Sequence, residues 1–486
     1  MKKFVVLLFM FLFVSNSYAL ELKANGAYRI RMFNTWGGGG SDTDMEKNAK
    51  SWNFGNVKDG DDDDQFFDQR LRLKLTADNR DGIRGVVTFE MGNAIWGDKN
   101  SYGRLGAGDG GSQVEVYNAY IEIDKWIYAK AGVFTFDSPN SAILSEELAG
   151  ILMGKDFNNF AVNLLYSKLY DGGSDTRGYD NNDDANLAGI MVPIKTDYFN
   201  VTPYFLYAHV GYKGQLYTAD NSGNLIDMYN GRLRSDLSVN NSLNLLGRTF
   251  SGDTFHNKYK DADAWWVGAA FDGKIPYANG VNWKLHGVYG SANVNSKKDR
   301  DLEMQGFLID GSLTYIYDRY KFDVYGLYSS GFDEGDYNGH EYDIMPTLAP
   351  DYMTYGTYAP FFFDSLGMGC YAYDPSGYSM VGGQVTFNSI ERLKHILDVA
   401  YIWNMIDEDV AGAAGITKGD TKSYIYRYMF DSFVEVALVN EYQIAEGTTL
   451  SMLAGALIPD ANRDAHGNKF EDDTAFAVNF KLQYNF

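Results

Sequence analysis

The end of the chain carries the pattern that most restricts what it can fold into. In residues 476–486, FAVNFKLQYNF, an apolar or aromatic side chain occupies every second position from Phe476 to Phe486, and mostly polar residues fill the positions between them. Alternation with period two predicts a β-strand with one apolar and one polar face. Such strands occur in sandwiches and in barrels, so this segment alone leaves the architecture open.

The same alternation returns near the start of the chain, where it separates charged from apolar residues. Segments 22–36, 66–78, 83–92 and 126–135 place basic residues on their polar faces: Arg29, Arg31, Arg70, Arg72, Lys74, Arg84 and Lys130. In a soluble sandwich this charged face would point outward to water. In a wide transmembrane barrel the assignment inverts, with lipid outside and water inside. Alternation by itself does not separate the two architectures.

The lengths of the connections favour the barrel. Short turns are expected at 79–82, 124–125, 156–158, 195–197, 318–319 and 388–393. Long polar insertions are expected between them, at 37–65, 93–112, 171–184, 211–261, 331–377 and 406–423. Short periplasmic turns alternating with long extracellular loops are typical of outer-membrane barrels.

Composition and the distribution of aromatic residues agree with one large all-β structure. The 486 residues include 52 Gly, 37 Tyr and one Cys, with a formal net charge of −22. This acidity argues against a nucleic-acid partner, one cysteine excludes a disulfide framework, and no apolar run of about 18 residues could form a membrane-spanning helix. Aromatic residues crowd the predicted strand ends, as expected of interfacial girdles. They include Trp126–Tyr128, Tyr198–Phe199, Trp265–Trp266, Tyr315–Tyr320, Trp403 and Tyr442.

The first residues predict an exported protein. MKKFVVLLFMFLFVSNSYA combines a basic start, an apolar stretch at 4–14 and a small-residue cleavage site at Ser17–Ala19. These are the three parts of a secretory signal peptide. We therefore expect residues 1–19 to be removed and residues 20–486 to form a single barrel domain, in a Gram-negative bacterium.

Counting alternating segments gives about 18 transmembrane strands. Sixteen is the alternative if segment 149–155 and one neighbour belong to loops. The chain resembles a bacterial outer-membrane porin, general or substrate-selective. The resemblance depends on the signal peptide, FDQRLRLKLTADNRDGIRGVVTFEMG at 67–92, WIYAKAGVFTF at 126–136 and the closing LQYNF.

The resemblance implies a transmembrane antiparallel β-barrel in the cell outer membrane. Its expected function is a water-filled channel for passive diffusion of ions and small hydrophilic solutes. Expected partners are outer-membrane lipid, lipopolysaccharide and two further copies in a homotrimer. No enzymatic activity, cofactor or bound metal is expected.

In such porins the third extracellular loop folds inward and narrows the channel. Here that connection is FDSPNSAILSEELAG at 136–150, which carries Asp137, Glu146 and Glu147. An acidic loop facing the basic residues of the first five strands would form a charged constriction. The alternative is that these charges line the lumen only because no other face tolerates them.

Two other functions stay open from the sequence. A barrel plugged by its loops could act as an adhesion or scaffold protein. A barrel hydrolase would need a nucleophile and a base, and His286 with Ser312 is the candidate pair on lumen-facing positions. The acidic runs at 59–64 and 180–184 are best explained as solvated charge, bridged to lipopolysaccharide by divalent cations.

Overall fold

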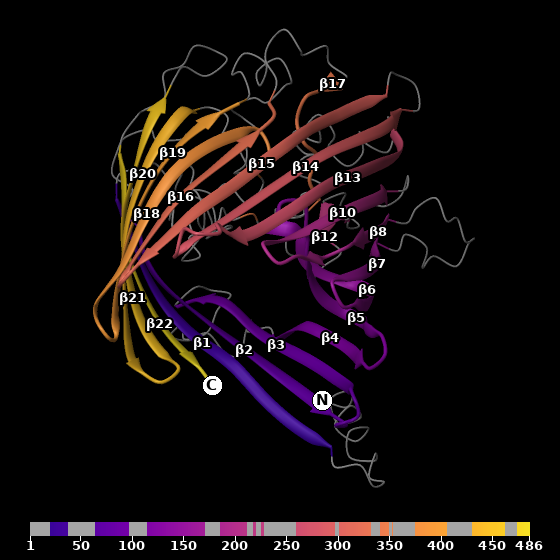
Figure 1. Cartoon of the computed structure of the whole chain (residues 1–486), viewed down its shortest axis with the longest axis horizontal. Helices are drawn as coiled ribbons and strands as arrows, with labels where there is room; N and C mark the ends of the chain where they lie inside the picture. The colour runs from indigo at the N-terminus through magenta and orange to yellow at the C-terminus, as the bar shows by residue number, and fades with distance from the viewer. Residues whose placement is uncertain are drawn as a thin grey trace.

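The computed structural model describes residues 20–36, 64–96, 114–170, 185–210, 217–219, 225–227, 259–296, 301–331, 341–348, 352, 375–405, 430–461 and 474–486. Nearly all of these residues lie in antiparallel strands that form one continuous wall (Figure 1). The strands tilt across one another, as closure of a sheet into a barrel requires.

The described part of the wall contains 18 barrel strands. They are β1 (Glu21–Trp36), β2 (Asp64–Asp78), β3 (Ile83–Ile95), β4 (Val114–Asp124), β5 (Tyr128–Asp137), β6 (Ser145–Phe157), β7 (Phe160–Tyr170), β8 (Ala185–Met191) continued by β9 (Ile194–Lys195), β10 (Phe199–Val210), β13 (Tyr259–Lys274), β14 (Val281–Ser296), β15 (Leu302–Tyr317), β16 (Tyr320–Ser329), β18 (Tyr378–Ile390), β19 (Leu393–Asn404), β20 (Phe430–Ala445), β21 (Thr448–Ala461) and β22 (Ala475–Asn485).

Three short strands and one turn of helix complete the described elements. Strands β11 (Tyr217–Ala219) and β12 (Leu225–Asp227) pair only with each other, and β17 (Glu341–Tyr342) adds in parallel to β15. The 3-10 turn η1 (Pro139–Ser141) lies between β5 and β6. No helix in the described ranges is long and apolar enough to cross a membrane.

The first and last strands close the barrel. Strand β22 pairs with β1 along its length, and in Figure 1 the yellow strand β22 and the indigo strand β1 lie side by side. The terminal residue takes part, because Gly26 N–H donates to the Phe486 carbonyl and Phe486 N–H donates to the Gly26 carbonyl. Closure removes the exposed sheet edges that would otherwise pair with other chains.

The outer face of the wall is apolar. Exposed side chains on it include Leu22, Val116, Ile121, Ile151, Leu164, Phe205, Val267, Ile309, Val324, Val381, Val399, Leu438 and Leu482. Charged side chains of β1–β3, such as Arg29, Arg72 and Glu90, alternate with apolar ones and lie on the lumen face. An apolar belt outside and polar residues inside is the arrangement of a transmembrane barrel, so the sequence-based prediction of the fold is confirmed.

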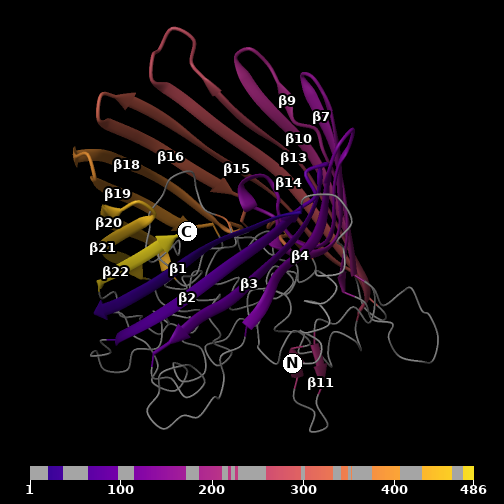
Figure 2. The same ribbon diagram turned by 90° about the horizontal axis from the view of Figure 1, so that it is seen from below.

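The connections follow the predicted asymmetry. Figure 2 shows the short turns together at one end of the barrel, including 158–159, 318–319 and 391–392. The strand ends that flank the long connections lie at the other end. Residues 149–155, which could have belonged to a loop, lie within β6.

One predicted girdle residue lies inside the barrel. Trp265 is exposed on the outer face, whereas Trp266 is fully buried on the lumen side. Adjacent residues of a strand point to opposite faces, so only one member of this pair can reach the membrane interface. The prediction for Trp266 is therefore wrong.

Candidate pore constriction

A row of cationic side chains lines the lumen across the closing seam of the barrel. Register places Arg31 opposite both Asp68 on β2 and Lys481 on β22, and it places Arg29 opposite Arg70. We call this lumen-facing set the basic wall: Arg29, Arg31, Arg70, Arg72, Lys74, Arg84, Lys130 and Lys481. The register thus places the seven basic residues predicted from the sequence on one face of β1, β2, β3 and β5, spread along the length of these strands.

Carboxylates on the same strands neutralise part of the basic wall. Arg31 Nε donates to Asp68 Oδ1 at 2.8 Å, and only 3% and 5% of the two side chains are exposed. Arg72 pairs with Glu90 on β3, and Arg84 pairs with Glu122 on β4. Each pair joins neighbouring strands, as expected for side chains directly opposite one another in an antiparallel ladder.

Aromatic rings hold two of the cations in place. The guanidinium of Arg72 lies 4.1 Å from the centroid of the Tyr117 ring. The ammonium of Lys130 lies 5.3 Å from the Tyr120 ring and 5.8 Å from the Tyr128 ring. Cation–π contacts fix the side chains without removing their charge, so the field of the basic wall is preserved.

The three predicted acidic residues lie in strands and occupy different environments. Glu147 hydrogen-bonds with Tyr117, the residue that stacks on Arg72, so it reaches the basic wall. Glu146 is opposite Phe136. Asp137 is exposed and accepts a hydrogen bond from Ser145 Oγ at 2.6 Å. Whether the three carboxylates shape a constriction together stays a prediction.

The segment that folds inward differs from the predicted one in length and in chemistry. The β5–β6 connection comprises residues 138–144, because β6 already begins at Ser145. Its tip, Ala142–Leu144, is buried and apolar, whereas an acidic loop was expected. The acidic residues belong to the flanking strands, whose hydrogen bonding extends further than the alternation indicated.

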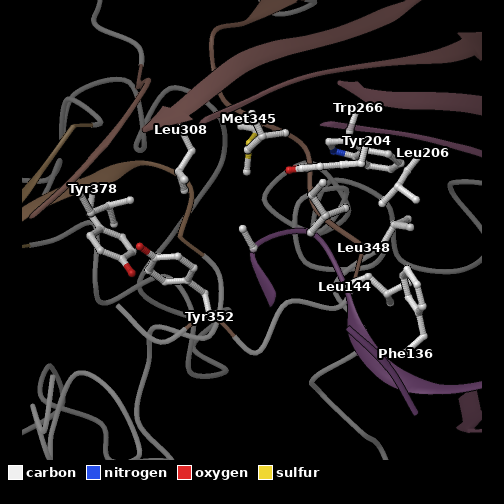
Figure 3. Close-up of a cluster of buried hydrophobic side chains, with 14 of the residues drawn as sticks. Phe136, Leu144, Tyr204, Leu206, Trp266, Leu308, Met345, Leu348, Tyr352 and Tyr378 are labelled. Carbon is white, nitrogen blue, oxygen red and sulfur yellow. The ribbon is translucent and has the colours of Figure 1, made fainter. Parts of the chain in front are cut away.

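A second inward segment meets the first. Residues 344–348, which follow β17, are buried in the lumen, and Leu348 N–H donates to the Ile143 carbonyl at 2.9 Å. Trp266 Nε1 donates to the Pro346 carbonyl at 2.7 Å. Figure 3 shows Leu348 between Leu144 and the wall residues Tyr204, Leu206 and Trp266. The two segments form one apolar body on this side of the barrel, and we refer to them as the inward segments.

Sequence reasoning did not include several charged residues that lie on the same face as the basic wall. Asp68, Glu90 and Glu122 occupy the same polar positions as the arginines, so the alternation could have identified them. Lys481 was missed because the last strand was treated separately from the first five. Closure of the barrel through β1 and β22 would have placed it beside Arg31.

The hydrolase pair proposed from the sequence is not formed. Ser312 lies opposite Lys284, whereas His286 lies opposite Asp310. The two ring nitrogens of His286 contact Asp310 and Tyr204. Among the described residues, no group of three or more His, Cys, Asp or Glu side chains could hold a metal ion. The acidic runs, apart from Asp64, lie outside the described residues.

Comparison with solved structures identifies the architecture. OccK11 (OpdR) of Pseudomonas aeruginosa superimposes with a TM-score of 0.50 at 11% identity, with 96% of each chain covered. The fold is that of an outer-membrane porin. OprD of Pseudomonas aeruginosa is also similar, with a TM-score of 0.49, 10% identity and coverage of 96% and 95%. OccAB3 of Acinetobacter baumannii gives 0.47, 12% identity and coverage of 96% and 100%.

At these identities the porin likeness concerns the fold alone. No family model matches the sequence, and no curated protein matches it. The solutes and ions that pass this porin-like barrel are determined by its own lumen residues.

Proposed function

We propose that this protein is an outer-membrane porin that lets ions and small hydrophilic solutes diffuse passively through a charged constriction. The observation that carries the proposal is the basic wall. The side chains of Arg72 and Arg84 keep 35% of their surface exposed although they face the lumen, and Lys74 is exposed there. Charges in such positions require water, because dehydrating an ionised group without full pairing is very costly.

The proposed constriction lies between the basic wall and the inward segments. Ion selectivity of a pore follows the charges nearest its narrowest point more than the net charge of the protein. The overall charge of −22 therefore does not make the channel cation-selective. The positive charges of Arg29, Arg70 and Lys481 attract anions, so we expect anions to permeate in preference to cations.

Single-channel conductance of the refolded protein, residues 20–486, in a planar bilayer tests this function. Stable unitary steps with a reversal potential on the anion side are expected under a salt gradient. Silent bilayers containing demonstrably inserted barrels would reject the channel.

A plugged barrel that serves as an adhesion or scaffold protein is the second candidate. One observation favours it: the buried apolar cluster extends from the inward segments to Phe33, Leu457 and Ala477 on the seam side. If this cluster closes the lumen completely, the inserted protein will not conduct, so the same recording separates the two functions.

The remaining features are proposals from the porin resemblance. Residues 1–19 lie outside the described residues, and their removal as a signal peptide would be tested by sequencing the N-terminus of the mature protein. Homotrimer formation and binding of lipopolysaccharide would be tested by native mass measurement of the protein extracted in mild detergent.

A further inference from the structure

The connection between β5 and β6 is closed by hydrogen bonds of its own. Ser138 Oγ accepts hydrogen bonds from the backbone N–H groups of Ile143 and Leu144, each at 3.1 Å, and Ser138 N–H donates to the Leu144 carbonyl at 2.8 Å. Asn140 and Ser141 have φ values of 56° and 53°. Two consecutive non-glycine residues in the left-handed region are strained, so contacts from outside the loop must stabilise this conformation.

A polar contact links this loop to β15, a strand remote in the sequence. Asn140 Nδ2 donates to Asp310 Oδ1 of β15 at 2.8 Å. Asp310 Oδ2 lies 2.9 Å from His286 Nδ1 on β14, and His286 Nε2 lies 2.8 Å from the Tyr204 hydroxyl on β10. The side chains of His286 and Asp310 are fully buried. A chain of hydrogen bonds thus joins the loop to three strands of the wall.

The structure assigns Asn140 and Asp310 as positioning residues that hold the loop across the lumen and thereby set the width of the channel. This inference rests on the proposed channel function. Apolar contacts are non-directional and tolerate sliding, whereas a buried carboxylate requires specific donors. Both oxygens of Asp310 are engaged, one by the loop and one by the wall, so displacement of the loop leaves a buried acceptor without its partner.

Displacement of the loop would also loosen the second inward segment. The Leu348 N–H bond to the Ile143 carbonyl ties residues 344–348 to the loop, and Trp266 ties the same segment to β13. The second inward segment therefore depends in part on the position of the loop. Release of the seven-residue loop should therefore displace residues 344–348 as well and widen the channel further than movement of the loop alone.

Exchange of the two polar groups tests the assignment. Asn140→Asp places a second carboxylate against Asp310, which should displace the loop. The double variant Asn140→Asp with Asp310→Asn restores the hydrogen bond with donor and acceptor exchanged, and the introduced amide oxygen can still accept from His286. Asn158→Asp is the matched control, because Asn158 also has a left-handed φ, of 58°, but is exposed in the short β6–β7 turn.

The assay records single channels and measures two quantities. They are the unitary conductance and the fraction of time spent in a state of higher conductance. Asn140→Asp should raise the population of the wider state by about tenfold or more, which corresponds to about 1.4 kcal/mol. The double variant should return to wild-type behaviour, and Asn158→Asp should not depart from it. Should Asn140→Asp fail to fold, Asn140→Gly deletes the amide while tolerating the left-handed backbone, and the same increase is expected.

Three outcomes would overturn the assignment. They are wild-type conductance in Asn140→Asp or in the glycine variant, an increase that the double variant does not reverse, and an equal increase in Asn158→Asp. Failure of the channel function itself is distinguishable, because the wild-type barrel would then insert without conducting.

Discussion

Reversal of one charge on the basic wall should change the ion selectivity of the channel measurably. Arg70 is the best position, because it lies directly opposite Arg29 in the β1–β2 ladder and faces the lumen. Arg31 and Arg72, by contrast, are paired with Asp68 and Glu90. Arg70→Glu therefore alters the field in the lumen without breaking a buried ion pair.

The size of the effect follows from Coulomb's law. A unit charge about 5 Å from a permeating ion in water interacts with it by about 0.8 kcal/mol. Reversal from positive to negative doubles the change to about 1.7 kcal/mol, and screening at 0.1 M salt reduces it to about 1 kcal/mol. The local anion concentration should fall by about fivefold and that of cations rise by a similar factor. The remaining cations, Arg29 and Lys481, moderate this shift.

The assay is the reversal potential of single channels under a potassium chloride gradient. Arg70→Glu should move it toward the cation side. Arg319→Glu is the matched control, because it makes the same change in net charge in the exposed β15–β16 turn, away from the basic wall. An unmoved reversal potential in Arg70→Glu, or an equal shift in both variants, would refute the placement of the basic wall at the constriction.

Three further predictions concern stability and assembly. Asp68→Ala should lower the free energy of unfolding by about 3–5 kcal/mol, since it leaves Arg31 charged and buried; a urea midpoint equal to wild type would contradict this. Gly382→Ala should cost about 1–3 kcal/mol because the new Cβ would lie 2.3 Å from the Tyr325 ring, whereas Gly85→Ala, with no atom within 4 Å, should be neutral in the same titration. Deletion of Phe486 should impair membrane insertion of the expressed protein, since its backbone bonds close the seam; normal insertion would show that the terminal residue is dispensable.

The strand pattern could be predicted from the sequence because it is local. Side-chain facing depends only on alternation, so the alternation is enough to place the arginines of β1 and β2 on one face of the sheet, as the register has them. The alternation fails where the β3–β4 ladder shifts register, near Thr88. Tyr117 and Asn118 are adjacent on β4 at this point, so simple alternation would place them on opposite faces. Tyr117 nevertheless stacks on Arg72 in the lumen. A bulge of this kind leaves no period-two signal.

The inward segments could not be predicted, because their partners are remote in the chain. Asn140 is held by Asp310, and Pro346 is held by Trp266, through pairs that no local periodicity links. The sequence of the loop suggested acidic chemistry because Glu146 and Glu147 are its most conspicuous residues. Both glutamates belong to strand β6, and the apolar residues Ala142–Leu144 form the tip of the loop.

The two sides of the lumen differ in polarity, and this difference bears on the route that solutes take. The inward segments are hydrogen-bonded to β13 through Trp266 and to β15 through Asp310, and the side chains at this interface are buried. His286 and Tyr204 extend the contact with Asp310 to β14 and β10. The basic wall spans β22 and β1–β5 and keeps partly exposed charges. Ionised groups keep their charge only where water or counter-charges reach them. We therefore expect the permeation path to run off the barrel axis, on the side of β2 and β3, so that every solute passes the partly exposed charges of Arg72 and Arg84.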